Sequence, residues 1–547
     1  MQKRLLSIVG LIAFSIASHA QALISATLKK SWNIQQIDSF YTSQGLPAAI
    51  LPKAHAVDVY QLAYNTVSYD GTTPTIASGL MVIPKNKSCE TPIMSYQHGT
   101  VLKRSDGPSF LSGEYVVGVA MGAEGYIAVI PDYLGLGLSN GIHPYVHANS
   151  EATAVADMIR ATREACEDLN VEYNEQIFLT GYSQGGHATM AAHKYLSQNF
   201  PNEFKVQASV PMSGPYSLSE VMRDLILSNT PYSNPAYLPM VIETYRTVYN
   251  IYPNINDAIV APFDSLLPIW TNGNYSSSYV DNQMNTLNAN PPKAIVKPAV
   301  LDTFSNDSTH ILRVLLKQND VYRWVPQQPV HMLYCQADEQ VSYQNTIKAY
   351  NYMTGAGAPH ITKKDINSTL DHFTCAQFAM LEMRAFFDTM RYDKITINTE
   401  NLQLANGENA PNGSIGISIL GGKPPYSIAW SNGQTGNVAT DLAPGPYSVT
   451  VTGDNGCSQT QEFTMSYLLG LEDNSTQNPS KGIYPNPATD ILYLNHFIGN
   501  YNVADMSGRI IFSGTSTSEK NHVDVSSLTP GTYLFQSEDY RKIFIKK

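Results

Sequence analysis

A serine between two glycines is the strongest chemical signal in this sequence. Gly181, Ser183 and Gly185 form the pattern G-x-S-x-G, preceded by an apolar run and followed by residues of helical character. A serine in this pattern lies on a sharp strand-to-helix turn, with its hydroxyl pushed clear of the backbone. The first N–H groups of the helix and the positive end of its dipole face the same point. The pattern therefore predicts a nucleophile that can attack a carbonyl carbon.

A nucleophilic serine needs a base, and the base needs an acid that orients it. Residues 330–338 are predicted to form a strand that ends on Asp338, and residues 360–366 form another strand candidate, followed by a loop that carries His372. The order serine, acid, histidine is that of α/β-hydrolases, and a parallel sheet gathers such side chains at the carboxyl ends of its strands. We therefore predict that Asp338 is the acid and His372 the base.

Other residues compete for these two roles. Glu339 is the nearest alternative acid, but Asp338 comes first after the strand. His331 and His360 lie within strand candidates, a position more typical of structural histidines. Asp371 could support the site from behind or be a solvated loop charge.

The tetrahedral intermediate of such a reaction needs backbone N–H donors. In this fold one donor follows the nucleophile and another lies in the loop after the third strand. Residues 92–97 are a strand candidate, and Gly99 after it allows the backbone to approach a substrate closely. We therefore predict that the N–H groups of Thr100 and Gln184 form the oxyanion hole. Because His98 precedes the serine in the sequence, we interpret it as a residue that shapes the loop.

Strand-like and helix-like segments alternate from about residue 57 to residue 391. The alternation predicts an α/β fold, with a mostly parallel sheet and helices on both of its faces. Between residues 212 and 329 the pattern loosens, and short helices are the best candidates there. An α/β-hydrolase inserts a cap at this place, so we expect a helical cap at about residues 215–329. The pattern does not separate a fixed cap from a mobile one, or from an elaborate loop.

Several motifs together resemble the secretory lipase/esterase branch of the α/β-hydrolases. They are residues 96–100 (YQHGT), 131–137 (PDYLGLG) and 143–145 (HPY) leading into 150–152 (SEA), with the runs GYSQGG and ADEQV. The resemblance covers about residues 45–390. It implies hydrolysis of carboxylic esters through an acyl-serine intermediate, without a metal or organic cofactor. It does not fix the acyl length or the alcohol of the substrate.

The N-terminus has the features of a signal peptide. Two basic residues precede an apolar run, residues 5–17, that is too short to span a membrane. We predict a signal peptide at residues 1–22, with cleavage after Ala20 or Ala22; a short membrane anchor is the alternative. No later run reaches transmembrane length, so we expect a secreted or cell-surface protein.

Length and charge limit the function further. A chain of 547 residues suggests about two to four domains. There are 34 Lys and Arg residues against 45 Asp and Glu residues, which gives a net charge of −11. No basic stripe is present, and this argues against nucleic acid as a partner.

Five cysteines in an exported chain suggest disulfides. Cys335 and Cys375 lie beside the predicted acid and base, so a bridge between them would join those two loops. Cys89 begins the third-strand region and Cys166 lies late in the helix before the serine turn, and both are expected at the opposite edge of the sheet. We therefore predict the pairs Cys335–Cys375 and Cys89–Cys166, with Cys457 left over in another domain.

Beyond residue 392 the apolar spacing changes from helical to alternating, which predicts small antiparallel domains after a catalytic domain at residues 23–392. Residues 393–471 resemble the immunoglobulin-like repeats of bacterial surface adhesins; a spacer is favoured over a glycan-binding module. Residues 472–482 are a polar linker. Residues 483–547 resemble the C-terminal sorting domain of type IX secretion substrates, which implies the type IX machinery as a partner.

Two other functions remain open. A serine peptidase uses the same triad on the same fold, but no charged group for a peptide terminus is identifiable in the sequence. A surface adhesin with an inactive hydrolase domain fits the C-terminal repeat, but every predicted triad position is filled.

Overall fold

The computed structural model describes residues 21–87, 89–407, 409–467, 482–506, 509–518, 521–537 and 540–547. The described residues fall into two compact units. The first runs to Ile397 and includes Ile419–Ser427 and Val451–Gln459. The second comprises Asn398–Ser418, Ile428–Thr450 and the described residues from Thr460 onward. Nearly all of the predicted signal peptide and linker lies outside the described residues.

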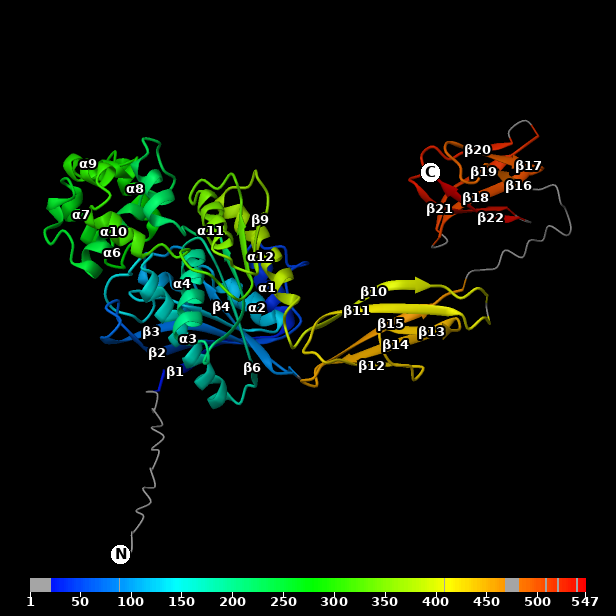
Figure 1. Cartoon of the computed structure of the whole chain (residues 1–547), viewed down its shortest axis with the longest axis horizontal. Coiled ribbons are helices and arrows are strands. Elements are labelled where there is room, and N and C mark those ends of the chain that lie inside the picture. The colour runs from blue at the N-terminus through cyan, green and yellow to red at the C-terminus, as the bar shows by residue number, and fades with distance from the viewer. Residues whose placement is uncertain are drawn as a thin grey trace, which may run out of the picture. The chain divides into compact units, whose positions relative to one another are not determined.

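A mostly parallel sheet is the centre of the first unit (Figure 1). Strands β4 to β9 pair in parallel, whereas β1, β2 and β3 form an antiparallel edge that joins β5. Strands β4, β5 and β8 are buried along their whole length, as expected of strands covered on both faces. In the described part of the chain the nine strands lie in the order β1 (Leu23–Trp32), β2 (Val57–Val67), β3 (Pro74–Pro84), β5 (Ile127–Pro131), β4 (Thr91–Gln97), β6 (Tyr173–Tyr182), β7 (Lys205–Met212), β8 (Val330–Tyr334), β9 (Ile361–Asp365).

Helices cover both faces of this sheet, as the sequence predicts. On one face α1 (Ile34–Ser43), α2 (Tyr115–Glu124) and α12 (His372–Asp388) bury apolar side chains in a single cluster. On the other face lie α3 (Ala148–Leu169), α4 (Gln184–Asn199) and α11 (Gln344–Gly355). Burial of these two apolar layers is the main stabilising force of the unit.

The predicted cap lies between β7 and β8 and has its own apolar core. Thr244 of the cap fastens it to the sheet part of the unit: its hydroxyl accepts the N–H of Tyr145 at 3.0 Å and donates to the carbonyl of His143 at 3.2 Å. The cap helices are α5 (Arg223–Leu227), α6 (Tyr237–Tyr249), α7 (Phe263–Trp270), α8 (Ser277–Thr286), α9 (Pro298–Asn306) and α10 (Ile311–Gln318).

After residue 394 the described chain forms only strands, in four small antiparallel sheets. The predicted immunoglobulin-like region holds sheets β10-β11-β13 and β12-β14-β15, and the last segment holds sheets β16-β17-β20 and β19-β18-β21-β22. The strands are β10 (Ile395–Gln403), β11 (Gly413–Gly421), β12 (Ser427–Trp430), β13 (Val438–Leu442), β14 (Gly445–Thr452), β15 (Ser458–Met465), β16 (Gly482–Tyr484), β17 (Ile491–Asn495), β18 (Gly499–Asp505), β19 (Ile510–Ser516), β20 (His522–Asp524), β21 (Gly531–Ser537) and β22 (Arg541–Lys546).

The disulfides confirm one predicted pair and correct the other. Cys335 and Cys375 are bonded, as predicted. The predicted pair Cys89–Cys166 is wrong: Cys89 bonds to Cys457, with the Cα atoms 5.7 Å apart, and Cys166 is a free thiol. The reason is orientation, because α3 turns the side chain of Cys166 inward, where it is fully buried among apolar residues of the sheet and helices.

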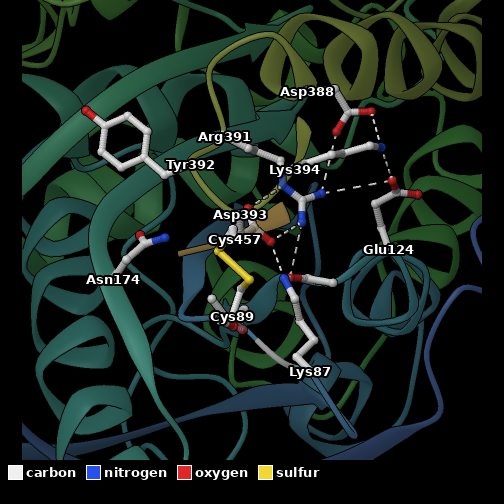
Figure 2. A network of polar contacts seen from close by, with 12 residues as sticks. Lys87, Cys89, Glu124, Asn174, Asp388, Arg391, Tyr392, Asp393, Lys394 and Cys457 are labelled. Atoms are coloured by element: carbon white, nitrogen blue, oxygen red, sulfur yellow. Dashed lines mark hydrogen bonds and ion pairs between the residues drawn. A yellow bond between two sulfur atoms is a disulfide. The ribbon is translucent and has the colours of Figure 1, made fainter. Parts of the chain in front are cut away.

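A buried ionic network lies around the Cys89–Cys457 bridge and fixes the segment that leaves α12 (Figure 2). The guanidinium of Arg391 is almost completely buried, lies 4.0 Å from the ring centre of Tyr126 and donates to Asp393 at 3.0 and 2.7 Å. Asp393 also pairs with Lys87. Asn455, two residues before the bridging cysteine, donates to the carbonyl of Tyr392 at 3.2 Å. Loops of the β-rich region thus pack within the first unit.

The bridge is expected to contribute to stability. Because it links positions 368 residues apart, the double substitution Cys89→Ser/Cys457→Ser should lower the free energy of unfolding of the first unit by about 2–4 kcal/mol. Thermal unfolding under oxidising conditions measures this, with Cys166→Ala as the control that leaves both bridges intact. Equal midpoints for wild type and the double variant would contradict a stabilising bridge.

Candidate active site

Ser183 lies on a strained turn between β6 and α4. Its backbone angles are φ 60° and ψ −122°, in a region that residues other than glycine rarely adopt. The glycines of the motif are required by space: a Cβ atom on Gly181 would lie 2.5 Å from the carbonyl oxygen of Gln97, and one on Gly185 only 1.8 Å from it. The G-x-S-x-G pattern therefore forms the sharp turn predicted from the sequence.

The predicted acid and base are in direct contact. Asp338 follows β8 and His372 is the first residue of α12, and the Oδ2 atom of the acid lies 2.7 Å from Nδ1 of the imidazole. The other carboxylate oxygen of Asp338 accepts the N–H groups of Gln340 at 3.0 Å and Val341 at 2.8 Å. Both side chains are buried, so this pairing is shielded from water.

The serine turn lies beside this pair. Tyr182, directly before the serine, donates its hydroxyl to the carbonyl of His372 at 2.6 Å, and the two rings lie 4.9 Å apart. The Cys335–Cys375 bridge ties the loop after β8 to the first turn of α12. The structure thus gathers Ser183, Asp338 and His372 at the carboxyl ends of β6, β8 and β9, as the order along the sequence predicts.

The competing residues have other partners. Glu339 accepts the backbone N–H of His372 at 3.0 Å, so it holds the backbone of that histidine and does not pair with its ring. His331 contacts Thr362 within the sheet at 2.7 Å, and His360 is exposed at the start of β9. Asp371 caps α12, since its carboxylate accepts a backbone N–H of the first turn at 2.7 Å.

The loop after β4 brings Thr100 next to the serine turn. The close approach of Gly185 to Gln97 and His98 shows that this loop and the start of α4 touch. Neither the N–H of Thr100 nor that of Gln184 has an acceptor among the described residues. Two free N–H groups on touching backbone segments are what an oxyanion hole requires.

A buried polar network behind the turn was not predicted from the sequence. The side-chain amide of Gln184 donates to Glu151 at 2.9 Å and to Nε2 of His143 at 2.8 Å. Glu151 also contacts Nδ1 of His187 at 2.7 Å. Burial lowers the pKa of His143 to about 4, so its neutral ring accepts at Nε2 and donates from Nδ1 to the carbonyl of Leu134. His143 and Glu151 belong to the HPY and SEA motifs of the sequence. Those motifs alone did not predict what the two side chains contact.

An apolar cavity extends from Ser183 into the cap. No charged side chain lines it. Its walls are Tyr145, Val146, Pro215, Leu218, Met222, Leu225, Ile226, Tyr232, Tyr237, Leu238, Val241, Pro292, Leu316 and Val341.

A second, deeper cavity is lined by side chains of the cap alone. It shares four wall residues with the first cavity, namely Ile226, Leu238, Val241 and Leu316, and all of its lining side chains except Tyr252 are purely apolar. These four side chains therefore stand in the walls of both cavities.

Neither a metal centre nor a spanning helix is found in the described part of the chain. No cluster of His, Cys, Asp and Glu side chains there has the composition of a metal site. None of the described helices is long and apolar enough to cross a membrane.

Asp281 makes the stability of the cap depend on pH. It lies on α8 and accepts the N–H of Ala236 at 2.8 Å, and burial raises its pKa from 3.8 to about 6. The folded protein therefore binds a proton at this carboxyl more tightly than the unfolded chain does. The stability that this group contributes is fully present at pH values below the pKa of the carboxyl in the unfolded chain. It is lost as the pH rises through the folded pKa of about 6.

Asp281→Asn should consequently be more stable than wild type at neutral pH, with an advantage that grows from about pH 4 to about pH 6. The amide oxygen of asparagine can still accept the N–H of Ala236. Thermal midpoints measured across this range test the prediction. Asp307→Asn is the control: hydrogen bonds from Thr309 lower the pKa of Asp307, so its effect on stability falls below about pH 4 and its profile should be flat across this range. Parallel pH profiles for the two variants would contradict the prediction.

Comparison with known proteins agrees with this geometry. Residues 113–383 match the secretory lipase family, and residues 482–547 match the secretion system C-terminal sorting domain. The predicted resemblances to secretory lipases and to sorting domains are thereby confirmed, and together they imply export to the cell surface or beyond it. Among curated proteins, none matches the chain.

Solved structures show the same fold. A protein from Legionella pneumophila is 26% identical, with a TM-score of 0.62, and the alignment covers 67% of this chain and 97% of that one. The rice cell wall degrading esterase LipA from Xanthomonas oryzae is also 26% identical, with a TM-score of 0.60 and the same coverage. Candida antarctica lipase A in its closed state is 17% identical, with a TM-score of 0.51 over 68% of this chain and 82% of that one; it shows the fold alone.

Proposed function

We propose that this chain, which carries a secretory lipase segment and a C-terminal sorting domain, is an exported serine hydrolase of carboxylic esters. The observation that carries the proposal is the strained Ser183 beside the Asp338–His372 pair, at the end of an apolar cavity. We further propose the division into a catalytic domain at residues 23–392, a spacer at 393–471 and a sorting domain at 483–547.

The reaction starts at the serine hydroxyl. Oγ of Ser183 attacks the ester carbonyl carbon while Nε2 of His372 takes the hydroxyl proton. Asp338 accepts the Nδ1 hydrogen, which fixes the tautomer and stabilises the imidazolium. The carbonyl oxygen becomes an oxyanion, and the N–H groups of Thr100 and Gln184 donate to it.

The intermediate then collapses and the acyl group is released. The alkoxide leaves and takes the proton from His372, so an alcohol departs and an acyl group stays on Ser183. Water repeats the sequence: His372 takes one of its protons, the hydroxide adds to the acyl carbon, and the proton returns to Oγ as the acid departs. The protein is unchanged after each cycle.

The cavity favours an ester over a peptide. A peptidase that reads a peptide terminus needs a charged side chain to pair with it, and the walls of the cavity offer none. The apolar walls suit an acyl chain, whose burial is favourable by about 0.8 kcal/mol per methylene. The cavities in the cap are therefore proposed to hold the acyl part of the substrate.

Ser183→Ala tests the nucleophile. Removing the hydroxyl should leave the fold intact and lower kcat by about 10⁴-fold or more. Turnover of p-nitrophenyl esters of graded acyl length is measured beside that of aminoacyl anilides, with circular dichroism as the control for folding. Near-normal ester turnover by the variant would refute the assignment; cleavage of anilides only would favour the peptidase, and no turnover by the wild type would favour the inactive adhesin.

Leu316→Trp tests the path of the acyl chain, because Leu316 lines both cavities. A larger side chain should block the deeper cavity and lower kcat/KM for a palmitoyl ester about tenfold or more, while butyrate turnover stays near wild type. Ile311→Trp, at an exposed residue of α10 that lines neither cavity, is the control for added bulk. An unchanged chain-length profile in Leu316→Trp would exclude this path.

A further inference from the structure

Glu114 reaches from the start of α2 to the loop that follows β4. Its two carboxylate oxygens lie 3.2 and 3.1 Å from the backbone nitrogen of Gly99. The hydroxyl of Tyr96, a fully buried residue of β4, donates to the same carboxylate at 2.5 Å. The carboxylate of Glu114 therefore joins the end of β4 to the loop that follows it.

This contact is not helix capping. Glu114 occupies the cap position of α2, where an acidic side chain usually accepts the free N–H groups of its own helix. Here its side chain makes no hydrogen bond to the helix and turns to Gly99 instead. The carboxylate of Glu114 therefore accepts from the N–H of the loop, and the first N–H groups of α2 receive no side-chain cap.

The contacts of the loop fix two successive peptide planes. The plane between His98 and Gly99 is held at both ends, because Glu114 accepts its N–H and the hydroxyl of Tyr133 donates to its carbonyl at 3.2 Å. In the next plane, the carbonyl of Gly99 accepts from Nδ1 of His98 at 2.7 Å. Carbonyl and N–H of a trans peptide point in opposite directions, so the N–H of Thr100 points away from the ring of His98.

We propose that Glu114 is a positioning residue that presets the N–H of Thr100 toward the oxyanion formed at Ser183. The inference rests on the proposed esterase reaction and names what holds one of its donors. A glycine without this contact is free to rotate, and the donor would then have to be oriented during each turnover. A donor held in place before the reaction avoids that reorganisation.

The test compares Glu114→Ala with wild type on p-nitrophenyl butyrate. Loss of the acceptor should lower kcat about 10- to 100-fold, less than full removal of a donor, and leave KM within about threefold. Inhibition by an alkyl boronic acid, whose tetrahedral adduct needs the same donor, should weaken in proportion to kcat/KM. Glu90→Ala, an exposed acid just before β4, is the matched control and should behave as wild type.

Glu114→Gln provides a second, isosteric variant in case the alanine variant does not fold. Its single amide oxygen must serve both Tyr96 and Gly99, so kcat should lie between the wild-type and alanine values. A folded variant with wild-type kcat, or a kcat loss without weaker boronate binding, would overturn the positioning role. These outcomes are separate from failure of the proposed function, which would show as a wild type without ester turnover or as an active Ser183→Ala variant.

Discussion

The close approach of two backbone segments at the serine turn is the constraint on which the active site depends. Gln97 at the end of β4 is in register with Gly181 on β6, and a Cβ atom at Gly185 would lie only 1.8 Å from the carbonyl oxygen of Gln97. Glycine alone fits, and the loop that carries Thr100 therefore lies against the first turn of α4. A shift of one residue in this parallel pairing would separate the two N–H groups proposed to bind the oxyanion.

Three carboxylates, two of them buried and one half-buried, keep this arrangement in place. Asp338 contacts the imidazole, Glu151 lies behind the serine turn, and Glu114 contacts the loop that carries Thr100. Each accepts at least two hydrogen bonds or close polar contacts. A buried carboxylate without partners is costly, so each network favours one geometry of the groups around it. The site is thus set by polar pairing within an apolar frame, while the cavity wall itself stays uncharged.

Covalent links add to this frame at two places. The Cys335–Cys375 bridge lies next to the acid and the histidine, and joins residues 40 positions apart. The Cys89–Cys457 bridge joins the start of the β4 region to a loop far along the chain, next to the buried pair Arg391–Asp393. Loops of the β-rich region therefore belong to the compact unit that holds the site, although their strands begin a different kind of sheet.

The sequence by itself determined the features that depend on local geometry. The turn at Ser183 follows from two glycines that a tight strand-to-helix turn requires. The placement of Ser183, Asp338 and His372 after strands follows from strands that all end at one edge of a parallel sheet. The presence and burial of these strands could be predicted, because short apolar runs bounded by turn residues are typical of strands covered on both faces.

Only the tertiary structure decided which distant side chains meet. Cys89 bonds to Cys457, 368 residues away, because α3 turns Cys166 into the core, and no spacing in the sequence encodes that rotation. The contacts of Glu114 with Gly99, and the two cavities with shared walls, likewise arise from packing between separate elements. Local patterns in the sequence determine the backbone conformation over a few residues. Contacts between distant elements depend on the packing of the whole fold.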